Sequence, residues 1–179
     1  MSDFVTAHNL WAPWRMEFFR APKEAGCFLC RIIRSGARAD AQNLVIHRGR
    51  KCLLLMNRYP YSNGHLMVVP RRHVGPLGEL TAAERAELLD LACLGQRLLA
   101  HVARPHGFNL GINEGVAAGA GLQDHLHLHV VPRWTGDTNF MPLLGQVRVV
   151  PQALAELWAA LRTALAQEKP RRGTRKGGK

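Results

Sequence analysis

The stretch His125-Leu126-His127-Leu128-His129, followed by Val130-Val131-Pro132, alternates histidine with an aliphatic residue three times. Side chains of a β-strand point to opposite faces with a period of two, so the alternation predicts a strand with all three imidazoles on one face and the aliphatic side chains on the other. A single histidine in a strand is usually structural, but three on one face contribute little to packing. The pattern therefore indicates a chemical role for this face.

Two chemistries suit a row of neutral imidazoles. Histidine is the commonest protein ligand of metal ions, and its neutral ring can also attack phosphorus as a nucleophile. An unperturbed pKa of ~6.5 leaves one ring nitrogen with a free lone pair near neutral pH. The glycine-rich segment 115–121 directly precedes the histidines, and its backbone N–H groups could approach phosphate oxygens closely. This neighbourhood favours phosphoryl chemistry over a catalytic metal held by three histidines.

The composition fits one globular domain. The chain has 179 residues, of which 47% are hydrophobic and 21% charged, so it has enough apolar residues for a core and too few charges for general disorder. No apolar run reaches the ~20 residues of a membrane span, and the first residues show no signal-peptide pattern. We therefore expect a cytoplasmic protein with no membrane partner.

The positive charge is concentrated at the C-terminal end. The formal net charge is +11, and the segment 169–179 carries six positive residues and no acidic one, which leaves +5 for the rest. We expect 169–179 to be a basic, disordered tail with at most weak attraction to nucleic acid, and 1–168 to form the domain. The moderately basic domain suits a polyanionic substrate such as a nucleotide.

The four cysteines do not indicate a disulfide framework. Cys52 and Cys93 lie in apolar segments typical of small buried residues. Cys27 and Cys30 have the Cys-x-x-Cys spacing of a metal-binding knuckle or a redox pair. Near a histidine-rich strand this pair favours zinc, because a tetrahedral Cys₂His₂ site needs only two further nitrogens.

Periodicity predicts an α+β fold. Thr81 and Glu84 have the pattern of a capping box, which begins a long helix that extends to about Ala103. Pro151 stands at a favourable first position for an amphipathic C-terminal helix. The expected strands are 44–46, 51–56, 65–70, 108–113 and the histidine stretch. Strands in meander order, interrupted by one long helix, predict an antiparallel sheet. The aromatic N-terminal arm, residues 9–15, is expected to pack on another surface, and its apolar character suits an interface.

The motif His-Leu-His-Leu-His-Val-Val at 125–131 resembles the signature of the histidine triad superfamily of nucleotide hydrolases and transferases. The resemblance extends from Trp11 to about Phe140 and includes Asn57, the step Gly64-His65-Leu66, the step Pro70-Arg71-Arg72-His73 and the glycine-rich segment. Within the superfamily, residues 11–15 and 132–140 resemble the bacterial branch that includes diadenosine tetraphosphate phosphorylases. The fold that this implies is the antiparallel sheet of the superfamily, with one long helix and a C-terminal helix.

The resemblance implies a role for each matching residue. His127 would attack the α-phosphorus and form a covalent nucleotidyl-histidine, with its other ring nitrogen donating to a backbone carbonyl. His129 would contact the phosphate oxygens and assist the leaving group, and His65 would support His129 from the adjacent strand. The residues that would bind substrate are Asn57 at the ribose, Asn113, Gly119 and Gly121 at the phosphates, and Trp134 in the phosphorylase-like segment.

The resemblance also implies a metal site and a dimer. Some members bind zinc through a Cys-x-x-Cys pair, the histidine of the Pro-x-x-His step and the first triad histidine, which here are Cys27, Cys30, His73 and His125. Four protein ligands leave no open position, so the zinc would be structural. No organic cofactor is implied. Superfamily members are commonly homodimers that join their sheets, which predicts a homodimer here.

One departure from the superfamily pattern bears on the reaction. Hydrolases often carry glutamine or serine four residues before the first triad histidine, where this chain has Gly121, with Gln123 two places away. The missing side chain would leave space that is consistent either with inorganic phosphate as acceptor or, equally, with a loosened hydrolase. Together with the phosphorylase-like Trp134 segment, we take phosphorolysis of diadenosine tetraphosphate to ADP and ATP as the leading expectation. The alternatives are a hydrolase of dinucleoside polyphosphates or nucleotide phosphoramidates and, in a different class, a zinc-containing binding module without catalysis.

Overall fold

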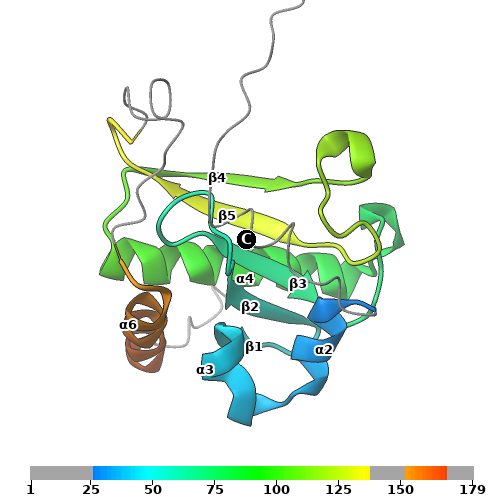
Figure 1. The fold of residues 1–179 in the computed structure, drawn as a ribbon, viewed down its shortest axis with the longest axis horizontal. Helices are drawn as coiled ribbons and strands as arrows, with labels where there is room; N and C mark the ends of the chain where they lie inside the picture. Colours follow the sequence, from blue (N-terminus) through cyan, green and yellow to red (C-terminus); the bar gives the residue numbers. More distant parts are fainter. Residues whose placement is uncertain (1–25, 138–151, 169–179) are drawn as a thin grey trace, which may run out of the picture.

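A computed structural model describes residues 26–137 and 152–168 (Figure 1). In chain order its elements are α2 (Phe28–Arg34), the 3₁₀ turn η1 (Ala37–Ala39), α3 (Asp40–Asn43), β1 (Val45–Arg48), β2 (Cys52–Met56), β3 (Leu66–Pro70), η2 (Leu77–Glu79), α4 (Ala82–Val102), β4 (Gly107–Ile112), η3 (Val116–Ala118), β5 (Leu128–Arg133) and α6 (Leu154–Gln167). The predicted N-terminal arm, the position of Pro151, residues 138–140 of the phosphorylase-like segment and the basic tail lie outside the described residues.

The five strands form one antiparallel sheet in the order β1-β2-β3-β5-β4, which confirms the predicted α+β class. The first three strands form a meander. The chain then crosses the sheet through α4, adds β4 at the edge, and returns through β5 between β3 and β4 (Figure 1). This order puts the histidine strand inside the sheet, with a neighbour on each side.

The two faces of the sheet are covered differently. On one face α4 and α6 pack over the sheet (Figure 1), and the main core lies between these helices and the strands. Its buried members include Leu54, Leu66, Val68, Leu128, Val130, Leu91, Leu98 and Leu161. On the other face a smaller cluster joins α2 to the first three strands through Leu29, Ile32, Val45, Leu53, Leu55, Met67 and Val69. Within the described residues, this second cluster includes no residue of β4 or β5 and is confined to the half of the face formed by the first three strands.

The long helix α4 begins as its sequence predicts. The Thr81 side chain accepts from the Glu84 backbone N–H, and the Glu84 carboxylate accepts from the Thr81 backbone N–H, which completes the capping box. Arg72, at the end of β3, adds a two-pronged ion pair to Glu84 at 3.0 Å. The pKa of Glu84 falls to about 2, first because of the Arg72 hydrogen bond and then because of the Thr81 N–H.

The histidine stretch is only partly a strand. Regular pairing in β5 begins at Leu128, so the prediction of a strand from His125 onward is wrong at its start. The Leu126 N–H donates instead to the Val74 carbonyl, which draws this segment toward the loop after β3 and out of the ladder. The alternation nevertheless persists: Leu126, Leu128 and Val130 belong to the main core, as predicted, and the histidines lie on the opposite side.

Other predictions differ from the structure in detail. β1 extends through His47 and Arg48, where a turn was expected, because these residues pair with Leu54 and Leu53. Cys93 is exposed, against the expectation of burial, since it lies on α4 away from the helix face that carries the buried leucines. The remaining strands match their predicted positions to within one residue. Within the described residues, no helix is both long and apolar enough to cross a membrane.

Candidate functional site

The catalytic candidates gather on the sheet face opposite α4, beside the smaller cluster that joins α2 to the first three strands. His129 lies in β5 between Met67 of β3 and Gly111 of β4, its two register partners. His65 immediately precedes β3, and His127 immediately precedes β5. The His127 and His129 rings meet edge to face with centroids 4.8 Å apart, and the His65 and His129 centroids are 5.0 Å apart. The structure therefore brings together the three residues for which catalysis was predicted.

The orientation of His127 leaves one particular nitrogen for chemistry. Its Nδ1 lies 3.0 Å from the backbone carbonyl oxygen of His125. A carbonyl oxygen only accepts, so Nδ1 carries the proton and donates, and Nε2 of the neutral ring keeps its lone pair. The residue is 9% exposed, which holds the ring in place while leaving a route to it. A neutral ring held in this way has the free lone pair that a nucleophilic imidazole requires.

The proton on His129 is fixed by a chain of hydrogen bonds that starts in the loop after β2. The backbone N–H of Tyr61 donates to Nδ1 of His65 at 3.1 Å. His65 must then carry its proton on Nε2, which donates to Nδ1 of His129 at 2.9 Å. Nδ1 of His129 is thus an acceptor, and the proton of its neutral ring lies on Nε2. His129 can donate to an oxygen, which is the role that the resemblance implies for it.

A pocket of about 180 Å³, open to solvent, adjoins His129 on the side of β4. Its lining residues are Tyr61, Asn109, Leu110, Gly111, Asn113, His129 and Val131. Asn113 was predicted as a phosphate ligand, and the structure places it beside His129. Tyr61, Asn109 and Gly111 were not predicted. The alternation of Asn109, Gly111 and Asn113 along one strand was the signal that could have identified two of them.

Of the remaining predicted substrate ligands, only Asn57 contacts one of the catalytic candidates in the structure. Asn57 follows β2, and its Nδ2 lies 3.3 Å from Nδ1 of His65 while its Oδ1 accepts from the Tyr59 N–H. Gly119 and Gly121 are exposed in the segment before His125, where Gly119 has a left-handed φ of 80°. Trp134 follows the far end of β5, and its indole N–H donates to the Ala103 carbonyl, so the structure does not bring it to the histidines.

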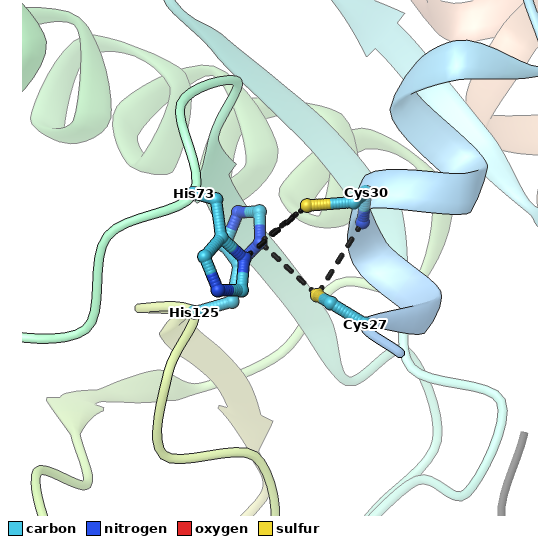
Figure 2. A group of neighbouring side chains, drawn as sticks. All are labelled: Cys27, Cys30, His73 and His125. Carbon is cyan, nitrogen blue, oxygen red and sulfur yellow. Dashed lines mark hydrogen bonds between the residues drawn. The ribbon is translucent and has the colours of Figure 1, made fainter. Parts of the chain in front are cut away.

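The four predicted metal ligands meet at one point (Figure 2). Cys27 and Cys30 come from the start of α2, His73 from the loop after β3, and His125 from the segment before β5. Their ligand atoms all lie within 4.8 Å of one another. Nδ1 of His125 is 3.3 Å from the Cys27 sulfur, and Nδ1 of His73 is 3.3 Å from the Cys30 sulfur.

The second ring nitrogen of His125 fixes its orientation toward the sulfurs. Its Nε2 lies 2.8 Å from the Pro70 carbonyl and donates to it, which leaves Nδ1 as the ligand atom. Burial lowers the pKa of His125 and raises the pKa of the Cys30 thiol, and both shifts favour neutral side chains. Two sulfurs and two imidazole nitrogens are the ligands that tetrahedral zinc takes in structural sites.

Comparisons with known proteins agree with this geometry. Residues 38–136 match the family model described as the HIT domain. The chain is 41% identical over 166 residues to the AP-4-A phosphorylase of Mycobacterium tuberculosis, an alignment that covers 89% of this chain and 85% of the relative. The fold resembles the crystal structure of a Zn-bound histidine triad family protein from Mycobacterium smegmatis, with a TM-score of 0.63, 30% identity, and coverage of 79% and 94% of the two chains. It also resembles a hypothetical histidine triad nucleotide-binding protein from Sulfolobus tokodaii, with a TM-score of 0.65, 25% identity, and coverage of 85% and 100%.

Proposed function

The chain belongs to the HIT domain family, and from this membership we propose that it cleaves dinucleoside polyphosphates by transferring a nucleotidyl group to His127 and then, preferably, to inorganic phosphate. Family membership and the identity to an AP-4-A phosphorylase support an enzyme that acts on nucleotides. The observation that carries the proposal is the orientation of His127, whose Nδ1 is held by a carbonyl and whose Nε2 is left as a nucleophile beside His129.

The reaction has two steps. In the first, the lone pair of His127 Nε2 forms a bond to the α-phosphorus, and the P–O bond to the leaving nucleoside polyphosphate breaks with its electron pair on oxygen. His129 Nε2–H donates to the departing oxygen. In the second step an oxygen of inorganic phosphate attacks the same phosphorus, the P–N bond breaks, and its electron pair returns to His127. Diadenosine tetraphosphate then yields ATP in the first step and ADP in the second.

The substrate ligands follow from the same arrangement. Asn57 at the end of β2 would bind the ribose, and Asn113 with the backbone of Gly119 and Gly121 would bind the phosphates. The identity of the acceptor has a direct test. Diadenosine tetraphosphate is incubated with the enzyme with and without phosphate. ADP and ATP formed only with phosphate support phosphorolysis, whereas AMP and ATP formed without phosphate identify a hydrolase.

The cluster of Cys27, Cys30, His73 and His125 would hold one structural zinc ion, which in this position ties α2 to the segment that carries the nucleophile. The ion would supply no catalytic chemistry, because all four positions are taken by protein ligands. Within the described ranges 26–137 and 152–168, the group that could hold a metal includes only one triad histidine, which argues against a three-histidine catalytic metal. The non-catalytic zinc module receives no support from the relatives.

A homodimer remains a prediction from the resemblance. β4 is the edge strand of the sheet beside the pocket, and Leu110 on it is a large hydrophobic residue that is 44% exposed in this chain. An edge strand with an exposed leucine suits pairing with a second copy. Sedimentation of the full chain would test it. Cytoplasmic location likewise remains a prediction.

A further inference from the structure

Most residues that line the described pocket lie across β3 and β5 from the residue proposed to bind ribose, while Tyr61 reaches the pocket from the loop after β2. Across the sheet the order is β2, β3, β5, β4, so Asn57 at the end of β2 and Gly111 in β4 are separated by the strands that carry His65 and His129. Three strand spacings amount to ~14 Å. If the transferred nucleotide lies over β2 and β3, the pocket beside β4 is open to the other half of the substrate.

The pocket has room next to the histidine that would assist the leaving group. Gly111 is the register partner of His129, and a Cβ added to Gly111 would meet no heavy atom within 4 Å. Any larger residue here would project a side chain into that space, on the same face as His129. Glycine in a strand interior often marks a place where a ligand approaches the backbone closely.

One lining residue is held so that it offers a donor. The guanidinium of Arg133 donates to Oδ1 of Asn109 at 2.8 Å and, through its other nitrogens, to both carboxylate oxygens of Asp137 at 2.6 and 2.8 Å. A guanidinium cannot accept, so these contacts fix which end of the Asn109 amide is oxygen. The group that Asn109 can present to a pocket ligand is therefore its Nδ2, a donor.

The chemistry of the lining suits an anion. Among the residues that the structure describes, no carboxylate lines the pocket, while Asn109, Asn113 and His129 can all donate. Asn109 is opposite Val131, two residues or ~7 Å along β5 from His129, which is within reach of a polyphosphate chain that begins at His129.

We propose that this pocket binds the phosphates of the leaving nucleotide, and that Asn109, oriented by Arg133, determines selectivity for substrates with a polyphosphate leaving group. This inference rests on the proposed function. The incoming phosphate must attack from the side that the leaving group has vacated, so the acceptor enters beside His129 in the second step.

The test compares two substrates that share the transferred adenylyl group but differ in the leaving group: diadenosine tetraphosphate, which releases ATP, and adenosine 5′-phosphoramidate, which releases ammonia. Asn109→Asp keeps an oxygen for Arg133 but replaces the donor by a negative charge. We expect it to lower kcat/KM for the tetraphosphate by about tenfold or more, as for loss of a hydrogen bond to a charged group, and to change cleavage of the phosphoramidate less than about twofold. The matched control is Asn43→Asp, which makes the same change in α3 beyond the opposite edge of the sheet and should affect neither reaction.

A second variant covers the case in which Asn109→Asp misfolds. Gly111→Val fills the space beside His129. It should also lower kcat/KM for the tetraphosphate more than for the phosphoramidate. Equal losses for both substrates, or no loss for either, would overturn the proposal. If the wild-type protein cleaves neither substrate, the proposed function fails. Calorimetric titration with ATP then tests whether the pocket binds phosphates at all. ATP must bind the wild-type protein and must bind Asn109→Asp more weakly, or the inference is wrong.

Discussion

Nε2 of His65 lies 2.9 Å from Nδ1 of His129, and the direction of this hydrogen bond is set by the backbone N–H of Tyr61 on the far side of the His65 ring. The Tyr61 ring also stacks on His65, with centroids 4.6 Å apart and planes 22° from parallel. The loop between β2 and β3, through the Tyr61 N–H, thus determines which ring nitrogen of His129 carries the proton. In this arrangement His65 is a positioning residue, because it acts on the substrate only through His129.

Replacing His65 with phenylalanine keeps a ring against Tyr61 but removes the hydrogen bond to His129. We expect kcat to fall about 10–100-fold, in the range typical of residues that orient a functional group through a hydrogen bond, with a much smaller change in KM. Steady-state kinetics on diadenosine tetraphosphate measure both. His101→Phe, at an exposed position in the last turn of α4, is the control for the substitution itself. A His65→Phe enzyme with wild-type kcat would show that the proton on His129 does not depend on His65.

His127→Ala should abolish turnover while leaving the fold intact, because in the proposed mechanism only this ring forms the covalent intermediate. Loss of a covalent nucleophile typically costs many orders of magnitude in rate. Mass spectrometry of wild-type enzyme quenched during turnover should find a nucleotidyl adduct on His127, and none in the variant. Circular dichroism provides the check on folding. A variant that keeps more than about a tenth of the wild-type rate would rule out the nucleophilic role.

Cys27→Ser should lower metal content and thermal stability together, because the free energy of metal binding to a structural site is also folding free energy. Activity should fall as well, since His125 connects the cluster to the segment that carries His127. Zinc is measured by atomic absorption and stability by thermal unfolding. Cys93→Ser, at an exposed cysteine on α4, should change neither. Metal-free wild-type protein of undiminished stability would contradict the zinc site.

The ion pair between Arg72 and Glu84 predicts a loss of stability in acid. Glu84 is 5% exposed, and its pKa in the folded protein is about 2, below the ordinary value of 4.5. A carboxyl whose folded pKa is lowered stabilises the protein above its unfolded pKa, and this contribution disappears as the pH falls from about 4.5 to 2. Glu84→Gln should be less stable than wild type at neutral pH, and the difference should shrink through that interval. Denaturant unfolding at several pH values measures it, and a difference independent of pH would contradict the assignment.

The sequence predicts those features that depend on neighbours along the chain. The capping box at Thr81 and the buried positions of Leu126 and Leu128 follow from local spacing, and the structure confirms them. The insertion of β5 between β3 and β4 does not follow, because an alternating pattern identifies the buried face of a strand but not which strands lie beside it. Tyr61 could be assigned only to a loop, since its contact with His65 depends on how that loop folds back.

The last prediction concerns the acceptor and rests on Gly121, where related hydrolases often carry glutamine or serine. Gly121 lies in the segment between β4 and His125 that also contains Gly115 and Gly119, both with positive φ. If its missing side chain leaves an anion site beside the leaving group, inorganic phosphate would be held there by backbone N–H groups of this segment. Gly121→Gln would fill the site, and we expect it to lose phosphorolysis more than hydrolysis, by about tenfold or ~1.4 kcal/mol of differential transition-state binding. Gly121 itself is not among the glycines with positive φ, so its backbone does not demand glycine. A variant that merely distorts this segment should lose both reactions equally. Both rates are measured on one preparation by separating ADP from AMP. If Gly121→Gln leaves the ratio of phosphorolysis to hydrolysis unchanged, Gly121 gives no reason to prefer phosphate over water as the acceptor.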